Sequence, residues 1–103
     1  MSETELSLGV AHVLERLGCI VIRVHSGQVR VGGGYMQCAP SGTPDRLVLM
    51  PGGRSCWLEI KEKHGKISID QKIWMDRAAR LGHRVAVVRS VSEAVDVIKE
   101  AMR

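Results

Sequence analysis

The chain has 103 residues, 45% of them hydrophobic, and a formal net charge of +4. This length fits one small domain over residues 1–103, and no apolar run reaches the ~18 residues that a membrane span needs. No secretion signal opens the sequence, and three widely spaced cysteines without a CxxC pair indicate neither a zinc site nor a disulfide framework. We therefore expect a cytoplasmic protein with reduced thiols, of which Cys19 and Cys56 pack as small apolar residues.

The first part of the chain predicts a helix and a strand. Ser2 and Glu5 have the spacing of a capping box, and apolar residues then recur at helical spacing up to Gly18, a natural helix end. The strand is predicted over residues 20–24.

A long segment over residues 26–43 follows the first strand and is rich in Gly, Ser, Gln and Pro. It is predicted to be a loop, and the alternative is a loop that contains a short strand over residues 28–31. Loops of this length in small domains are often functional. We expect the run from Gly32 to Gly34 to form a flexible lip over a substrate.

The second half predicts two strands, a helix, a strand and a last helix. In chain order these elements cover residues 47–50, 56–61, 68–81, 85–88 and 90–102. A Pro-Gly-Gly turn joins the first two strands into a hairpin, and Ser-x-x-Gln and Ser-x-x-Glu signatures open the two helices. The helix over 68–81 is predicted to bury its apolar residues Ile69, Ile73, Trp74, Ala78 and Leu81. The whole order, α-β-β-β-α-β-α, predicts an α/β domain with a mixed sheet flanked by helices.

Asp45, Glu59 and Lys61 carry the strongest chemical signal. Side chains alternate along a strand, so Glu59 and Lys61 point to the same face. When the glycine turn closes the hairpin, Asp45 comes level with Glu59 on the neighbouring strand. Two carboxylates and an ammonium then meet at one end of an apolar sheet. Carboxylate oxygens are the ligands that hard divalent cations prefer, and a metal-activated water needs a polar group to orient it.

Four sequence segments carry a resemblance to a known family. Pro44-Asp45 followed by Glu59-Ile60-Lys61 resembles the PD-(D/E)xK nuclease core. The wider segments narrow this resemblance to VRR-NUC domains: Gly42-Thr43-Pro44-Asp45, Glu59-Ile60-Lys61, Gln71-Lys72-Ile73-Trp74 and Gly82-His83-Arg84-Val85-Ala86-Val87-Val88-Arg89-Ser90. The resemblance covers nearly the whole chain and is weakest over residues 25–40.

The resemblance implies a restriction-endonuclease-like fold and a metal-dependent DNA endonuclease. In such an enzyme Mg²⁺, or Mn²⁺ in its place, is bound by Asp45, Glu59 and the backbone carbonyl of Ile60. Lys61 lies near the attacking water or the scissile phosphate, where it lowers the cost of developing negative charge.

Small standalone members of this family act like Holliday-junction resolvases, which cut two strands symmetrically. The resemblance therefore implies a homodimer that acts on branched DNA or four-way junctions, in the cytosol of a bacterium or a phage-infected host. We expect the dimer contact on an apolar face of the first or the last helix.

Two polar residues, Glu5 and Gln71, each allow two interpretations. Glu5 stands where the family carries an acid on its first helix, but it also completes the capping box with Ser2, and Glu15 is the second candidate for that acid. Gln71 stands where the family has a glutamine that lines the site, but Ser68 makes it a capping partner. The resemblance gives both Glu5 and Gln71 a supporting part in catalysis.

Basic residues cluster in sequence around the predicted site: Arg46, Arg54, Lys61, Lys63, His64, Lys66 and Lys72. A basic rim beside a carboxylate pocket suits a polyphosphate substrate. The expected DNA contacts are Arg46, Lys63, His64, Lys66 and Lys72. For residues 63–66 a solvated charged loop is the alternative. The rival function is a nucleic-acid-binding module that has the same fold and no cleavage activity.

Overall fold

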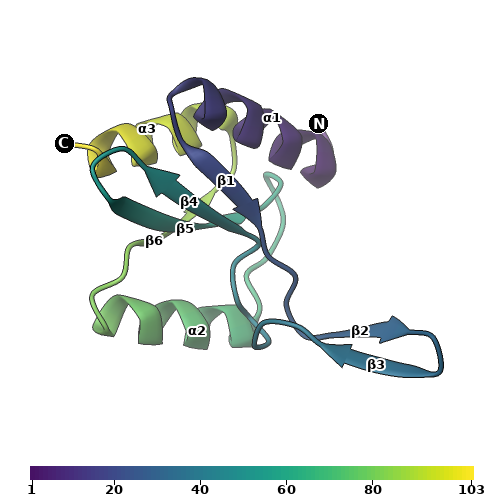
Figure 1. Ribbon diagram of the computed structural model, residues 1–103. Coiled ribbons are helices and arrows are strands. Elements are labelled where there is room, and N and C mark those ends of the chain that lie inside the picture. Colours follow the sequence, from purple (N-terminus) through teal and green to yellow (C-terminus); the bar gives the residue numbers. More distant parts are fainter.

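The computed structural model describes residues 1–103 as one mixed sheet between helices, with a separate β-hairpin (Figure 1). The elements are α1 Glu3–Arg16, β1 Ile20–Arg23, β2 Gln28–Val31, β3 Gly34–Gln37, β4 Arg46–Met50, β5 Arg54–Ile60, α2 Ile69–Arg80, β6 Val85–Val88 and α3 Val91–Ala101. The main sheet has the strand order β1-β4-β5-β6, with α1 and α3 on one face and α2 on the other. None of the helices is long and apolar enough to cross a membrane.

Strand pairing makes the main sheet mixed, as the sequence predicts. β4 pairs antiparallel with both β1 and β5, and β6 pairs parallel with β5. The β4–β5 hairpin closes through Gly52 and Gly53, which both have positive φ. The parallel pair needs a crossover connection, which α2 supplies. The predicted chain path α-β-β-β-α-β-α is confirmed, with β2 and β3 inserted after its first strand.

The hydrophobic core lies between the sheet and the layer formed by α1 and α3. Every second residue of β4 is buried, which is the alternation of a sheet that packs one face on helices. The core cluster consists of Leu6, Val10, Leu14, Cys19, Val48, Met50, Cys56, Leu58, Ile60, Val88, Ala94, Ile98 and Ala101. Cys19 and Cys56 are buried free thiols, as expected.

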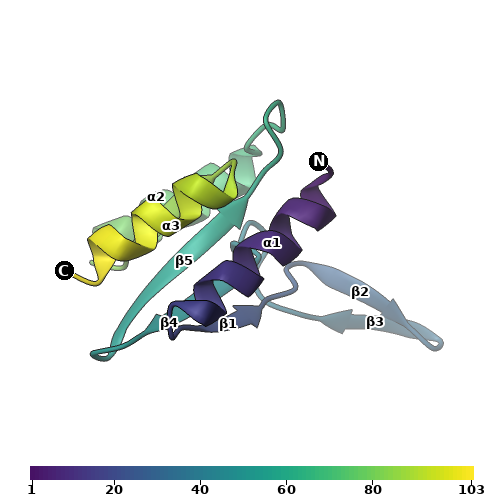
Figure 2. The same cartoon turned by 90° about the horizontal axis from the view of Figure 1, so that it is seen from above.

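The segment that the sequence predicts as a loop folds largely into the β2–β3 hairpin. Val29 lies opposite Met36 and Arg30 lies opposite Tyr35 in an antiparallel pair that extends away from the body (Figure 2). The alternative prediction of a strand over 28–31 is confirmed, but the loop prediction is wrong for Gly34–Gln37. The glycine run that we expected to be a flexible lip supplies the tight turn between two strands too short to show a clear alternation in the sequence.

α2 buries less of its surface than its sequence predicts. Ala78 is the only buried residue of the predicted apolar face, and Trp74 is half-buried against Trp57 of β5, with ring centroids 5.1 Å apart. The other three residues of that face are exposed, namely Ile69, Ile73 and Leu81. α2 packs on β6 and on Trp57, so most of its apolar side chains have no strand beneath them to pack against.

Gly42 fixes the loop before β4 against the first turn of α2. Its φ of +89° lies in the left-handed region, and a Cβ at this position would overlap the backbone carbonyl of Asp70. The Ser41 hydroxyl donates to Asp70 Oδ2 at 3.1 Å beside this contact. Gly42 therefore lets the chain that enters β4 lie directly on the N-terminus of α2.

Gly42→Ala is expected to destabilise the fold by about 2 kcal/mol or more beyond the strain of a positive φ alone. Gly52→Ala is the matched control, because Gly52 has a similar φ of +84° and nothing within 4 Å of an added Cβ. The control should cost about 1–2 kcal/mol. Chemical denaturation of both variants measures the difference, and equal losses would show that α2 does not depend on this contact.

Candidate active site

Asp45 and Glu59 face each other where β4 begins and β5 ends. The antiparallel register of the two strands, continued by one residue, places Asp45 opposite Glu59. The backbone carbonyl of Asp45 accepts the N–H of Val24 at 2.9 Å, and its Oδ1 accepts the N–H of Ile60 at 3.2 Å. These hydrogen bonds hold Asp45 between β1 and β5, level with Glu59 as the sequence predicts.

Both carboxyl groups resist ionisation. Burial raises the pKa of Asp45, although the N–H of Ile60 and the charge of Arg46 act in the opposite direction. Burial, followed by the charge of Asp45, raises the pKa of Glu59 to about 7 against the opposing effect of the Lys61 ammonium. Glu59 is only 4% exposed. Asp45 is half-buried and Glu59 is buried, and the two carboxylates repel each other when both are ionised, so a cation between them would stabilise the pair.

Gln71 combines the two functions between which the sequence leaves a choice. Its amide nitrogen donates to Glu59 Oε1 at 2.8 Å. Its amide oxygen accepts the N–H of Ser68 at 2.8 Å, and the Ser68 hydroxyl accepts the N–H of Gln71 at 3.2 Å, which completes the capping box. Because the cap restrains the amide of Gln71, this side chain orients the Glu59 carboxylate.

The oxygens of this site fit a small hard cation that also keeps water or phosphate ligands. No group of three or more His, Cys, Asp and Glu side chains is arranged to hold a metal ion. Two carboxylates remain. Asp45 uses one oxygen to accept the N–H of Ile60, and Glu59 uses one oxygen to accept the side-chain amide of Gln71. Mg²⁺ commonly takes one or two carboxylates and several waters. The residues present therefore fit Mg²⁺, which Asp45, Glu59 and the Ile60 carbonyl would hold.

The acid of α1 that acts on the carboxylate pair is Glu3, which the sequence analysis does not single out. Its charge raises the pKa of both carboxyl groups, and it lines the same cleft as Asp45. Glu5 is engaged in the helix cap: its N–H donates to Ser2 Oγ and its carboxylate accepts the Ser2 hydroxyl, both at 3.1 Å. Glu15 is exposed near the other end of α1. The contacts of Glu5 support the capping interpretation, and Glu3 is the acid of α1 whose charge reaches the carboxylate pair.

Arg46, one of the expected DNA contacts, is largely buried. Its side chain is 7% exposed, and its guanidinium donates to the Ser7 hydroxyl and to the carbonyl of Asp45. Its charge also lowers the pKa of Asp45. Arg46 therefore ties α1 to the start of β4 and offsets part of the carboxylate charge, and its burial leaves little of it for a substrate.

The other basic residues lie on the loop after β5 and on α2, and all are exposed: Lys63, His64, Lys66 and Lys72. Arg89, at the end of β6, holds this loop through hydrogen bonds from its Nη1 to the carbonyls of Glu62 at 2.8 Å and Gly65 at 2.7 Å. The sequence gives no signal for that contact. Arg54 lies at the far end of β5 from the carboxylates, so the basic rim does not extend to it.

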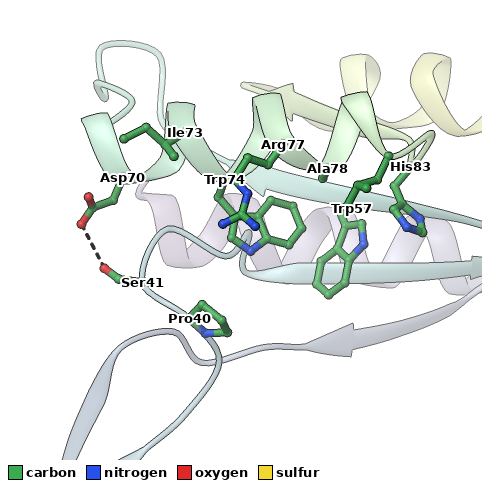
Figure 3. Close-up of a pocket in the computed structure, with 10 residues that line it drawn as sticks. Pro40, Ser41, Trp57, Asp70, Ile73, Trp74, Arg77, Ala78 and His83 are labelled. Atoms are coloured by element: carbon green, nitrogen blue, oxygen red, sulfur yellow. Dashed lines mark hydrogen bonds between the residues drawn. The ribbon is translucent and has the colours of Figure 1, made fainter.

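Two pockets of different chemistry lie near the site. A polar cleft of about 350 Å³ opens beside Asp45, and its lining includes Glu3, Ser7, Arg23 and His25. A larger and more apolar pocket of about 510 Å³ lies under α2, where the sequence analysis expects core (Figure 3). Its lining includes Trp57, Trp74 and Pro40, and none of the carboxylates of the site. The polar cleft is therefore the one that opens to the chemistry at Asp45.

The raised pKa of Glu59 predicts that stability falls as the pH rises. Between pH 4.5 and about 7 the unfolded chain has lost a proton that the native state still binds, so the free energy of unfolding decreases across this window. The loss is on the order of 3 kcal/mol and is complete above the native pKa. Urea denaturation at pH 5 and pH 8 measures it, with Glu59→Gln as the control that has no proton to lose. Parallel behaviour of wild type and variant would contradict the prediction.

Comparison with known proteins supports the architecture. The fold matches a solved structure described as a VRR_NUC domain, with a TM-score of 0.73 and 24% sequence identity. The match covers 96% of this chain and 97% of that chain. No protein-family model and no curated protein matches the sequence. The expected restriction-endonuclease-like architecture and the resemblance to VRR-NUC domains are confirmed at the level of the fold. The chain therefore has the fold of a VRR_NUC domain.

Proposed function

We propose that the protein is a metal-dependent DNA endonuclease that hydrolyses phosphodiester bonds. The observation that carries the proposal is the pairing of Asp45 and Glu59, two carboxyl groups with raised pKa values at one end of the sheet. Like charges at a buried position lower stability, so a purely structural role does not account for them. A cation site accounts for them. The likeness to a solved VRR_NUC domain supports the same proposal of a nuclease.

Each residue of the site has a part in this reaction. Asp45, Glu59 and the Ile60 carbonyl would hold Mg²⁺ or Mn²⁺, which would supply polarisation of the scissile phosphate and a bound water of lowered pKa. Gln71 keeps the Glu59 carboxylate in one orientation through its 2.8 Å hydrogen bond. Lys61 lies near enough to lower the pKa of Glu59, and its ammonium stabilises the negative charge that develops on the phosphate.

The exposed cations beside the site support DNA as the substrate. Two of them, Lys63 and Lys66, lie with His64 on the loop that Arg89 restrains, so their charges stay near the end of β5. Lys72 adds a third from α2. Phosphate contacts of this kind release counterions, so the affinity for DNA should fall steeply as salt rises.

We further propose a homodimer that acts on branched DNA such as four-way junctions. A single site cuts one strand, so symmetric cutting requires two sites related by a two-fold axis. The apolar faces of α1 and α3, where we expected the contact, are buried in the core. The outer face of the sheet is a better contact, because its apolar side chains are exposed on neighbouring strands: Ile20, Ile22 and Leu49.

Cleavage assays on supercoiled, linear and four-way-junction DNA test the nuclease proposal. We expect cleavage with Mg²⁺ or Mn²⁺, none with EDTA, and a preference for the junction. Ca²⁺ should bind but support little turnover, because its looser coordination holds the water poorly. Binding without cleavage in every metal would favour the rival, a nucleic-acid-binding module.

Light scattering of the free and DNA-bound protein tests the dimer. Ile22→Glu should give a monomer, while Leu81→Glu, at the exposed C-cap of α2, is the matched control that should not. A wild-type protein that is monomeric in both states would remove the dimer. Paired-nick mapping adds a separate result, since cuts confined to one strand of a junction would leave a nuclease without resolvase activity.

A further inference from the structure

The β2–β3 arm is a ribbon that projects from the body and is exposed along its whole length. All eight of its strand residues are exposed. Three backbone hydrogen bonds hold its root: the N–H of Gly27 donates to the carbonyl of Ala39 at 2.8 Å, that of Cys38 to the carbonyl of Gly27 at 2.9 Å, and that of Ala39 to the carbonyl of His25 at 3.0 Å. An isolated two-stranded sheet is marginally stable in water. An arm of this kind is suited to a partner that covers it.

The two faces of the arm differ in polarity. Residues paired across the strands share a face, and side chains alternate along each strand. One face is apolar and carries Val29, Val31 and Met36. The opposite face carries only hydrogen-bonding side chains: Gln28, Arg30, Tyr35 and Gln37. Gln37 donates to backbone carbonyls at the root of the arm, at 3.2 and 3.5 Å, and the other three side chains make no hydrogen bond within the chain.

The charge around the arm has one sign. No Asp or Glu occurs from Arg16 to Pro44, a segment that includes Arg23, His25 and Arg30. The ion pairs of the structure join Arg80 to Asp76 and Arg103 to Glu100, so Arg23 and Arg30 have no acidic partner. Arg23 and His25 line the polar cleft beside Asp45. Arg30 on the arm and Arg23 at its root therefore offer positive charges that no ion pair within the chain occupies.

We propose that the β2–β3 arm places its polar face in the major groove of duplex DNA next to the phosphate held at Asp45. The major groove of B-form DNA is about 12 Å wide and admits a two-stranded ribbon, whose strands lie about 4.8 Å apart. Arg and Gln side chains hydrogen bond to guanine and adenine edges in that groove. Arg23 and His25 meet the backbone at the groove edge. The inference deepens the proposed function, on which it rests for the choice of DNA.

Binding to a fluorescent duplex, measured by anisotropy in Ca²⁺, tests the arm. The double variant Arg30→Ala/Tyr35→Ala should lose about 10-fold or more in affinity. Arg103→Ala is the matched control, because it removes one exposed cation from the opposite end of the molecule (Figure 1). Duplex RNA should bind about 10-fold more weakly than DNA, since its deep and narrow major groove does not admit side chains.

Protection of guanine N7 from methylation reports the groove itself, because N7 lies in the major groove. We expect protection by wild type and its loss in the double variant. Unchanged affinity and unchanged protection in that variant would overturn the inference. So would a result in which substitution of Val29 and Met36 by Ser dissociates a dimer while the double variant binds DNA normally, since the arm would then be a protein contact.

Failure of the proposed function gives a different result. A protein that binds duplex DNA through the arm and cleaves it in no metal refutes the nuclease and leaves the arm in place. A protein that cleaves DNA and binds it equally well with the arm variants refutes the arm and leaves the nuclease.

Discussion

Asp45→Asn and Glu59→Gln are each expected to lower the rate of DNA cleavage by about 10³-fold or more, since each removes one of two carboxylates from a three-ligand cation site. The fold should survive both changes. An asparagine at position 45 would still accept the N–H of Ile60, as Asp45 does, and a glutamine at position 59 would still accept the amide of Gln71. Cleavage of a four-way junction in Mg²⁺, together with circular dichroism, measures activity and folding.

The stability of the Glu59→Gln variant provides a control that is independent of the cleavage assay. Above pH 7 the variant should unfold with a higher free energy than wild type, because it no longer carries a carboxylate whose pKa is raised by burial and by Asp45. Added Mg²⁺ should raise the melting temperature of wild type and leave that of the variant unchanged. Full cleavage activity in either purified variant would refute the assignment of the site.

Lys61→Ala is expected to lower the cleavage rate by about 10²-fold, the scale for loss of one preorganised electrostatic group. The affinity for Mg²⁺ should stay the same or rise, because the ammonium repels a cation. The pKa of Glu59 should rise further, because the variant lacks the Lys61 charge that lowers this pKa in the wild-type protein. Single-turnover cleavage and calorimetric Mg²⁺ titration separate these effects.

Lys61→Arg is the matched control, because it keeps the charge at the same position and should recover part of the rate. Loss of Mg²⁺ binding in Lys61→Ala would give the lysine a structural role, as the ionic partner of Glu59. A rate equal to that of wild type would remove it from the reaction altogether.

Local patterns in the sequence determined the elements that position the site. The alternation of side chains along residues 56–61 and the glycine turn before them suffice to bring Asp45 level with Glu59, because strand geometry and a short hairpin leave little freedom of register. The Ser-x-x-Gln signature likewise predicts the start of α2, and its glutamine turns out to reach Glu59 as well. Both inferences depend on neighbours along the chain or across one turn.

The β2–β3 arm shows where local patterns fail. Its strands are four residues long and carry a Gly-rich turn, so composition alone resembles a loop. The pairing of Val29 with Met36 depends on two segments together, and the sequence of either strand alone does not predict it. The poor burial of Ile69, Ile73 and Leu81 has a related cause, because helical spacing defines an apolar face but not the amount of sheet beneath it.

The α/β class, the order of the main elements and the carboxylate pair can all be read from the sequence, since they follow from periodicity, turn chemistry and cross-strand register. Three features of the site come from packing alone: the charge of Glu3 raises the pKa of Glu59, Arg46 is buried against Ser7, and Arg89 holds the basic loop. Those outcomes depend on how α1 and β6 lie against the rest of the fold. Burial and charge act through space, and the distances through which they act are set by packing rather than by spacing along the chain.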